Sequence, residues 1–126
     1  MKKFFLCIFL VIFFSNISFA DWLLGAKTKN DAWYYESSSI VKDGDITYVW
    51  TLTDYNHIGK YNEMSVKSYV PIKCKLKQFQ VVTIVYYPKN MGKGSLLERI
   101  ENPDIKWIPA PPGSAWAGII KKVCEK

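Results

Sequence analysis

The stretch from Asp45 to Asp54 constrains the fold more than any other part of this chain. Its side chains alternate, with Ile46, Tyr48, Trp50 and Leu52 at one set of positions and Thr47, Val49, Thr51 and Thr53 at the other. A period of two, sustained over ten residues rich in β-branched and aromatic side chains, is typical of a β-strand. Any fold for this chain must therefore contain a β-sheet.

Further strands are predicted on both sides of this segment. Residues 33–36 and 39–41 have extended character, and the Asp-Gly pair within residues 42–45 favours a tight hairpin into the following strand. Residues 64–69 and 79–87 predict two more strands. The second of these is apolar on both sides, which places it in the interior of the sheet.

The segments that interrupt or follow these strands contain proline, lysine and glycine. Pro71 indicates a bulge or an edge strand, since proline cannot donate to a ladder. Residues 73–77 fit either the end of a long strand or the tip of a hairpin, and the sequence leaves both open. Residues 90–94 predict a turn, and residues 106–108 a short last strand.

The periodicity changes after Pro111-Pro112-Gly113. Ser114 is placed to cap a helix, and the apolar residues that follow have the i, i+3, i+4, i+7 spacing of one helical face: Trp116, Ile119, Ile120 and Val123. Cys124 lies on the same face. We therefore expect the α+β class, with one domain in which a C-terminal helix covers one face of an antiparallel sheet.

The first twenty residues have the pattern of a secretory signal. Lys2 and Lys3 precede an uncharged apolar run of 11 residues, and the segment ends in Ser18-Phe19-Ala20, with small residues at −3 and −1. The run is too short to cross a bilayer, which needs roughly 20 apolar residues. We expect cleavage after Ala20, leaving residues 21–126 as one domain exported to the periplasm, the outer cell surface or the medium.

Removal of the signal would also remove Cys7, so that Cys74 and Cys124 remain. In an oxidising compartment one disulfide is the default for two cysteines. It would close a loop of about 51 residues, worth roughly 4 kcal/mol in the chain-entropy model, and would attach the helix to the sheet. The alternative is a redox or nucleophilic pair, but the Cys-x-x-Cys spacing typical of such sites is missing.

Candidate catalytic chemistry is sparse. His57 is the single histidine and lies in a polar segment after the alternating strand, where a loop residue is the simplest interpretation. A zinc site needs about four nitrogen or sulfur donors. We therefore expect no catalytic residues, no metal and no cofactor. Removal of residues 1–20 lowers the formal net charge from +6 to +4, which is mildly basic, and we do not expect an exported chain of this kind to bind nucleic acid.

Three lysines alternate around Cys74: Lys73, Lys75 and Lys77. On an extended backbone their ammonium groups would share one face, with Lys67 nearby. One interpretation is an edge or turn kept soluble by lysine. The other is an anion-binding strip for sulfated glycans or acidic protein segments. Six tyrosines offer further contact area, although sheet packing accounts for most of them: Tyr34, Tyr35, Tyr55, Tyr61, Tyr86 and Tyr87.

An ordered set of residues resembles the surface-adhesin protein E family over essentially Trp22 to Cys124. The matching residues are Trp33-Tyr34-Tyr35, Tyr48-Val49-Trp50, Asp54-Tyr55, Lys67-Ser68-Tyr69, Cys74, Tyr86-Tyr87, Met91-Gly92-Lys93-Gly94, Trp107, Pro112-Gly113-Ser114 and Val123-Cys124. One departure is Glu36, where the family pattern commonly has Asp. A second is that no lipid-attachment box surrounds Cys7, so we expect no lipid anchor.

The resemblance implies an exported Gram-negative bacterial protein with an antiparallel sheet, a C-terminal helix and a disulfide between Cys74 and Cys124. It also implies a non-enzymatic binding module that attaches to host extracellular-matrix proteins. Sulfated glycans are a second possible ligand class, and a homodimer is left open. The alternative function is a periplasmic structural or accessory protein, or an inhibitor, with no host ligand.

We predict that the exported protein begins at Asp21 and carries no acyl chain, because small residues precede this bond and no lipid-attachment box does. The intact mass of the exported protein, measured by mass spectrometry, checks this. A mass that includes a lipid, or residues 1–20, would contradict it.

Overall fold

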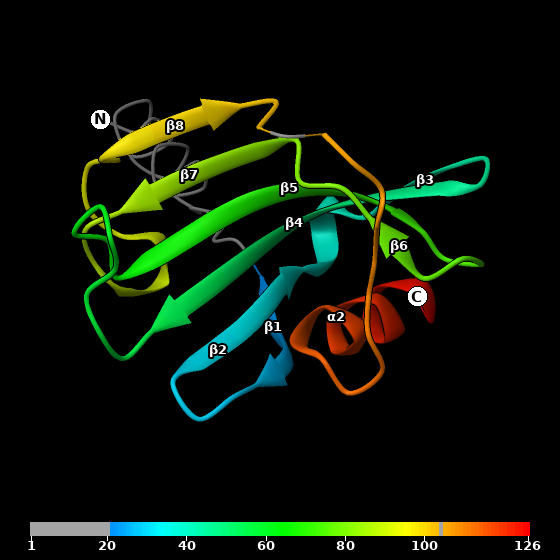
Figure 1. Cartoon of the computed structure of the whole chain (residues 1–126), viewed down its shortest axis with the longest axis horizontal. Coiled ribbons are helices and arrows are strands. Elements are labelled where there is room, and N and C mark those ends of the chain that lie inside the picture. The colour runs from blue at the N-terminus through cyan, green and yellow to red at the C-terminus, as the bar shows by residue number, and fades with distance from the viewer. Residues whose placement is uncertain (1–20, 104) are drawn as a thin grey trace, which may run out of the picture.

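The computed structural model describes residues 21–103 and 105–126 (Figure 1). The expected signal peptide lies outside the described residues. The strands are β1 (Trp22–Lys27), β2 (Asp31–Glu36), β3 (Val41–Asp43), β4 (Ile46–Tyr55), β5 (Ser65–Lys73), β6 (Gln78–Phe79), β7 (Thr83–Tyr87), β8 (Glu98–Glu101) and β9 (Ile108–Pro109). Two 3-10 turns, η1 (Ser37–Ser39) and η2 (Asn90–Gly92), and the helix α2 (Ala115–Cys124) complete the description.

The long antiparallel pair β4–β5 organises the sheet. Its register runs from Ile46 opposite Lys73 to Asp54 opposite Ser65. Each strand changes its outer neighbour part of the way along: β4 pairs with β3 and then β2, and β5 pairs with β7 and then β6. One path of strands is therefore β1-β2-β4-β5-β7-β8, and a shorter one is β3-β4-β5-β6-β9.

Pro71 lies inside β5, opposite a bulge: Tyr69 pairs with Thr83 and Ile72 pairs with Phe79, so the neighbouring segment has one extra residue between these two pairs. The bulge that the residue type suggests is thus confirmed. Its carbonyl accepts a hydrogen bond of 3.0 Å from the amide of Gln80. Because the amide and carbonyl of one strand residue point to the same side, the missing N–H faces the 80–82 interruption between β6 and β7. The bulge at residues 80–82 therefore accommodates a proline inside β5.

The alternation in β4 separates two faces of the sheet. Val49 lies opposite Val70, and Thr47 opposite Ile72, on the face that carries α2. The side chains on that face and on the helix form one buried cluster: Tyr35, Val49, Val70, Ile72, Phe79, Ile119, Ile120 and Val123. The other positions of β4 and β5 turn their side chains to the opposite face, on which α2 does not lie and the turn η2 packs.

The helix forms as its sequence predicts. The Ser114 hydroxyl accepts a hydrogen bond of 3.2 Å from the amide of Ala117, which satisfies one of the free donors at the helix start. Trp116 stacks on Phe79 with ring centroids 4.2 Å apart, and contacts Trp33 edge-on at 5.3 Å. These aromatic contacts fix the beginning of α2 against the sheet.

The edge strand β1 was not predicted, and it packs directly against α2 (Figure 1). The register of β1 shifts between Leu24 and Ala26, so that Gly25 lies at the irregularity. A Cβ placed on Gly25 would lie 2.4 Å from Cδ1 of Ile119. Glycine at this position therefore lets the strand and the helix approach closely.

Most of the predicted elements are confirmed, including the α+β class with its antiparallel sheet, the hairpin at residues 42–45 and the turn at residues 90–94. The prediction of a single strand over residues 79–87 was wrong. Residues 80–82 leave the ladder, and the two parts, β6 and β7, pair with different parts of β5. The expected extended segment at residues 39–41 is partly the 3-10 turn η1.

The Cys74–Cys124 disulfide is confirmed, with Cα atoms 5.8 Å apart. Cys74 follows the last residue of β5, and Cys124 is the last residue of α2. The bridge therefore holds the end of the helix to the sheet, while the aromatic contacts of Trp116 hold its beginning.

We predict that the double variant Cys74→Ser/Cys124→Ser lowers the free energy of unfolding by about 2 to 5 kcal/mol, because the unfolded chain gains the freedom that the cross-link removes. Urea unfolding followed by circular dichroism measures this. The reduced wild-type protein is the matched control and should unfold at the same urea concentration as the variant. Two thiols that titrate in the native, unreduced domain would contradict the bridge.

Candidate binding site

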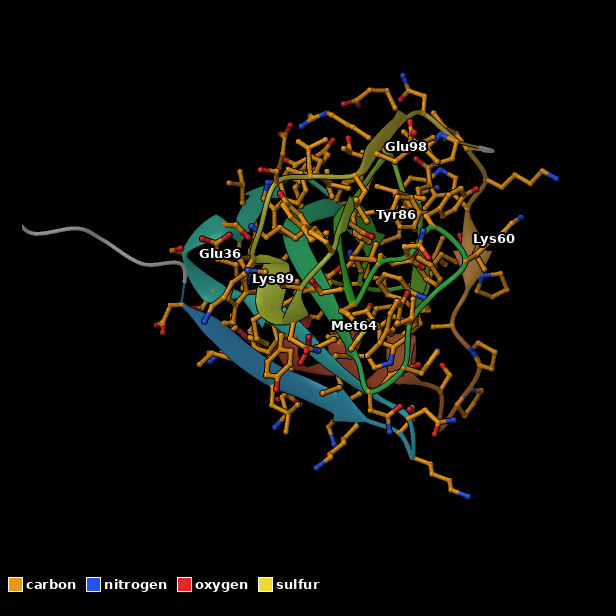
Figure 2. All side chains as sticks on the ribbon, turned by 90° about the vertical axis from the view of Figure 1, so that its left-hand side faces the viewer. Glu36, Lys60, Met64, Tyr86, Lys89 and Glu98 are labelled. Carbon is orange, nitrogen blue, oxygen red and sulfur yellow. A yellow bond between two sulfur atoms is a disulfide. The ribbon has the colours of Figure 1, made fainter. Side chains whose placement is uncertain are left out.

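The sheet face opposite α2 is curved around a hollow of about 360 Å³. Each strand of the longer path contributes to its lining: Trp22 from β1, Glu36 from β2, Trp50 from β4, Lys67 from β5, Val85 and Tyr87 from β7, and Arg99 from β8. Because β1 and β8 are the two ends of that path, both can line one hollow only if the sheet curls. Figure 2 shows this curl, with η2 between β1 and β8. We refer to these residues as the concave site.

Lys67 occupies the middle strand of the concave site and lies among aromatic rings. Its Nζ is 4.9 Å from the ring centroid of Tyr87 and 5.7 Å from that of Trp22. No carboxylate of the described residues forms an ion pair with this ammonium group. The side chain is half-buried. The site therefore contains a positive charge that aromatic rings partly compensate and that no anion neutralises.

The turn η2 closes over the stem of Lys67. Gly92 has a φ of +68°, and a Cβ placed on it would lie 2.5 Å from Cε of Lys67. A side chain at residue 92 would therefore strain the turn and displace the lysine. Asp54 fixes the turn from β4, because its Oδ1 accepts hydrogen bonds of 2.9 Å from the Met91 amide and from Nδ2 of Asn90.

Charged groups of both signs stand at the rim. Arg99 Nε lies 2.5 Å from Oε1 of Glu101, and the Thr83 hydroxyl donates to Oε2 of the same carboxylate at 3.0 Å. These hydrogen bonds, first that from Arg99, hold the pKa of Glu101 below its usual value. On β2, the Glu36 carboxylate accepts a hydrogen bond of 3.3 Å from Ser38.

Further rings extend the concave site along β4 and β5. Tyr69 lies between Trp50, at a centroid distance of 5.1 Å, and Tyr48, at 6.0 Å. All three are half-buried, on the face away from α2. The face therefore offers large, rigid aromatic contact area that costs little side-chain entropy to use.

The lysines singled out in the sequence do not form one strip, because β5 ends at Lys73 and residues 74–77 make the turn to β6. Lys73 places its Nζ 4.1 Å from the ring centroid of Trp107 and lines a small hollow with Lys75. Lys77 lines a different hollow, beside the disulfide. The hairpin tip is thus the correct alternative for this segment, while anion binding by these lysines stays a prediction.

His57 lies in the loop between β4 and β5, with Nδ1 3.3 Å from the Asn56 side-chain oxygen and 4.0 Å from Asp31. Within residues 21–103 and 105–126, no three His, Cys, Asp or Glu side chains are grouped so as to hold a metal ion. In the same described part of the chain, no helix has the length and apolar character needed to span a membrane.

Most of the concave site was missed by sequence reasoning. Lys67 was noted only as a neighbour of the Lys73 segment, and Trp22 and Arg99 were not singled out. Alternation could have placed Lys67 and Tyr69 on one face of β5. The meeting of that face with β1 and β8 depends on register and curl, which no local pattern gives.

The fold and site define a class of protein: a disulfide-bridged α+β domain that presents a concave, aromatic and charged sheet face. The model of the surface-adhesin protein E family matches residues 22–125, and the chain belongs to this family. Membership of a surface-adhesin family implies an exported or cell-surface protein.

Solved structures of Haemophilus influenzae protein E have a similar fold. The selenomethionine form superposes with a TM-score of 0.64 at 18% identity, covering 88% of this chain and 90% of that one. A second crystal form gives a TM-score of 0.61 at 18% identity, covering 88% and 91%. No curated protein is similar enough to this chain to be matched with it.

Tyr55, at the end of β4, adjoins a loop that contains the buried carboxylate of Glu63. The Glu63 side chain accepts a hydrogen bond of 2.7 Å from the amide of Tyr61. Burial, followed by the charges of Glu63 and Asp31, raises the pKa of Tyr55 from 10.0 to about 12. The folded protein thus keeps this phenol protonated at pH values where the unfolded chain would lose the proton.

We predict that Tyr55→Phe reduces the loss of stability at alkaline pH. The contribution of the raised pKa is fully present below pH 10 and is lost as pH rises toward 12. Because the side chain is half-buried, solvent screening limits the effect to roughly 1 kcal/mol. Urea unfolding of both proteins at several pH values from 8 to 12 measures it. Parallel pH profiles for the two proteins would contradict the assignment.

Proposed function

We propose that residues 21–126 form an exported adhesin module that attaches to host extracellular-matrix proteins through the concave site. Membership of the surface-adhesin protein E family supports the binding role. The observation that carries the choice of surface is the arrangement of Trp22, Trp50 and Tyr87 around the unneutralised ammonium of Lys67.

The residue types in the concave site are those that dominate the energy of protein interfaces. Tryptophan, tyrosine and arginine are enriched among the residues whose truncation most weakens binding. Here they project from paired strands, so that their backbone positions are fixed before a partner arrives. Association therefore orders few groups, which limits its entropic cost.

The remaining surfaces are less suitable for a large partner. The α2 face is occupied by the core and the helix. The hollow beside the disulfide is lined by residues of α2 and of the adjoining turns, such as Ala117, Lys121 and Lys77. It gathers no tryptophan or tyrosine, and so lacks the anchors expected at the centre of a protein interface.

A periplasmic accessory protein or inhibitor is the competing function. It predicts that the exported protein stays inside the outer membrane, where proteases added to intact cells cannot reach it. Digestion of the chain on intact cells, with a periplasmic marker protein left whole, supports an adhesin. Protection of the chain under the same conditions would overturn the proposal.

We predict that Trp22→Ala weakens binding of the exported, purified protein to immobilised laminin or fibronectin at least tenfold, as expected for an aromatic anchor. Biolayer interferometry measures the affinity. Trp107→Ala is the matched control, because this half-buried tryptophan also lies under a lysine ammonium but outside the concave site. Equal effects of the two variants, or no binding by the wild type, would contradict the proposal.

A further inference from the structure

We infer that the concave site binds an acidic sugar unit, such as a uronic acid or a sulfated hexose within a polysaccharide chain. This inference rests on the proposed function and deepens it, because it names the chemistry recognised at the same site. Three properties of the hollow support it: its aromatic side chains, the unpaired ammonium group of Lys67 and a volume that fits one or two sugar rings.

The unpaired ammonium of Lys67 selects an anionic group. The lysine lies half-buried between the rings of Trp22 and Tyr87, where fewer water molecules screen its charge than at an open surface. An incoming carboxylate or sulfate would gain an ion pair without first displacing a protein carboxylate. The terminal nitrogens of Arg99 add planar donors at the rim, suited to the same groups.

The aromatic walls select a ring-shaped partner. Trp22 and Trp50 reach the hollow from β1 and β4, and Tyr87 from β7. The C–H faces of a sugar ring are apolar and can be buried on such rings, while its hydroxyls remain available for hydrogen bonds. A volume of about 360 Å³ is at the low end of the roughly 300 to 1,000 Å³ range of ligand sites, which suits one or two sugar rings.

Glu36 distinguishes an acidic sugar from a simple anion. A carboxylate in the lining would repel inorganic sulfate or phosphate, but it accepts hydrogen bonds from hydroxyl groups. Ser38 already donates to one of its oxygens, which leaves acceptor capacity on the carboxylate. A ligand that carries hydroxyl donors as well as an anionic group therefore matches this mixture of charges.

The test uses the exported, purified protein and three probes: a sulfated, uronate-containing disaccharide derived from heparin, a neutral disaccharide and inorganic sulfate. Isothermal titration calorimetry at low and physiological salt measures each affinity. We expect the acidic disaccharide to bind at least tenfold more tightly than either other probe, and its affinity to fall as salt rises.

The decisive variant is Lys67→Met, which keeps the aliphatic stem beneath η2 and removes the charge. We expect it to weaken binding of the acidic disaccharide at least tenfold. Lys60→Met is the matched control, since this lysine also lies over an aromatic ring, with its Nζ 5.7 Å from the ring centroid of Tyr61, but outside the concave site, and we expect a change of less than twofold. Unchanged thermal unfolding in both variants verifies that the domain remains folded.

Several outcomes would overturn the inference: no binding of the acidic disaccharide, equal binding of inorganic sulfate, equal binding of the neutral sugar, or equal effects of Lys67→Met and Lys60→Met. The proposed function is scored separately by the matrix-protein assay. Loss of matrix binding in Trp22→Ala without disaccharide binding would overturn the sugar inference alone. Disaccharide binding without matrix-protein binding would overturn the proposed attachment to matrix proteins alone.

Discussion

The register between β4 and β5 is the constraint on which the rest of this structure depends. It places Val49 against Val70 on one face and Trp50 against Tyr69 on the other, and a slip of one residue in either strand would turn that strand's side chains to the wrong face. The pair is long enough for each strand to have two successive outer neighbours. The same ladder therefore carries both the core under α2 and the opposite, concave face.

The two faces of the sheet differ in how far their side chains are withdrawn from water. On the α2 side, aliphatic side chains are withdrawn from water, and Val49, Val70 and Ile119 are completely buried. On the other side the rings remain half-exposed, and a lysine charge lies among them without an anion. The buried cluster that stabilises the fold thus lies mainly on the α2 face. The opposite face can therefore carry an unpaired charge and half-exposed rings, which would be unfavourable inside a core.

Local patterns in the sequence predicted the elements whose cause is local. The alternation of β4, the Asp-Gly turn before it, the Ser114 cap and the apolar face of α2 are each visible within about ten residues. The strand β1 was missed because Gly25 interrupts its pattern and its position depends on packing against Ile119. The break at residues 80–82 was missed because it reflects a one-residue shift in register against β5. The concave site is formed by strands on both sides of β4 and β5, from β1 to β8, and so only the tertiary structure reveals it.

The contact between β1 and α2 also affects the kinetics of folding. Residues 22–27 and 115–124 lie about ninety positions apart, and the core between them closes only when the helix arrives. Pairings so distant in sequence are typical of slow folding, on the scale of milliseconds to seconds. Until then the apolar side of the sheet is open to water and to other chains. The Cys74–Cys124 disulfide can lock the domain only after the helix has docked, when an external oxidant takes two electrons, with two protons, from the two thiols.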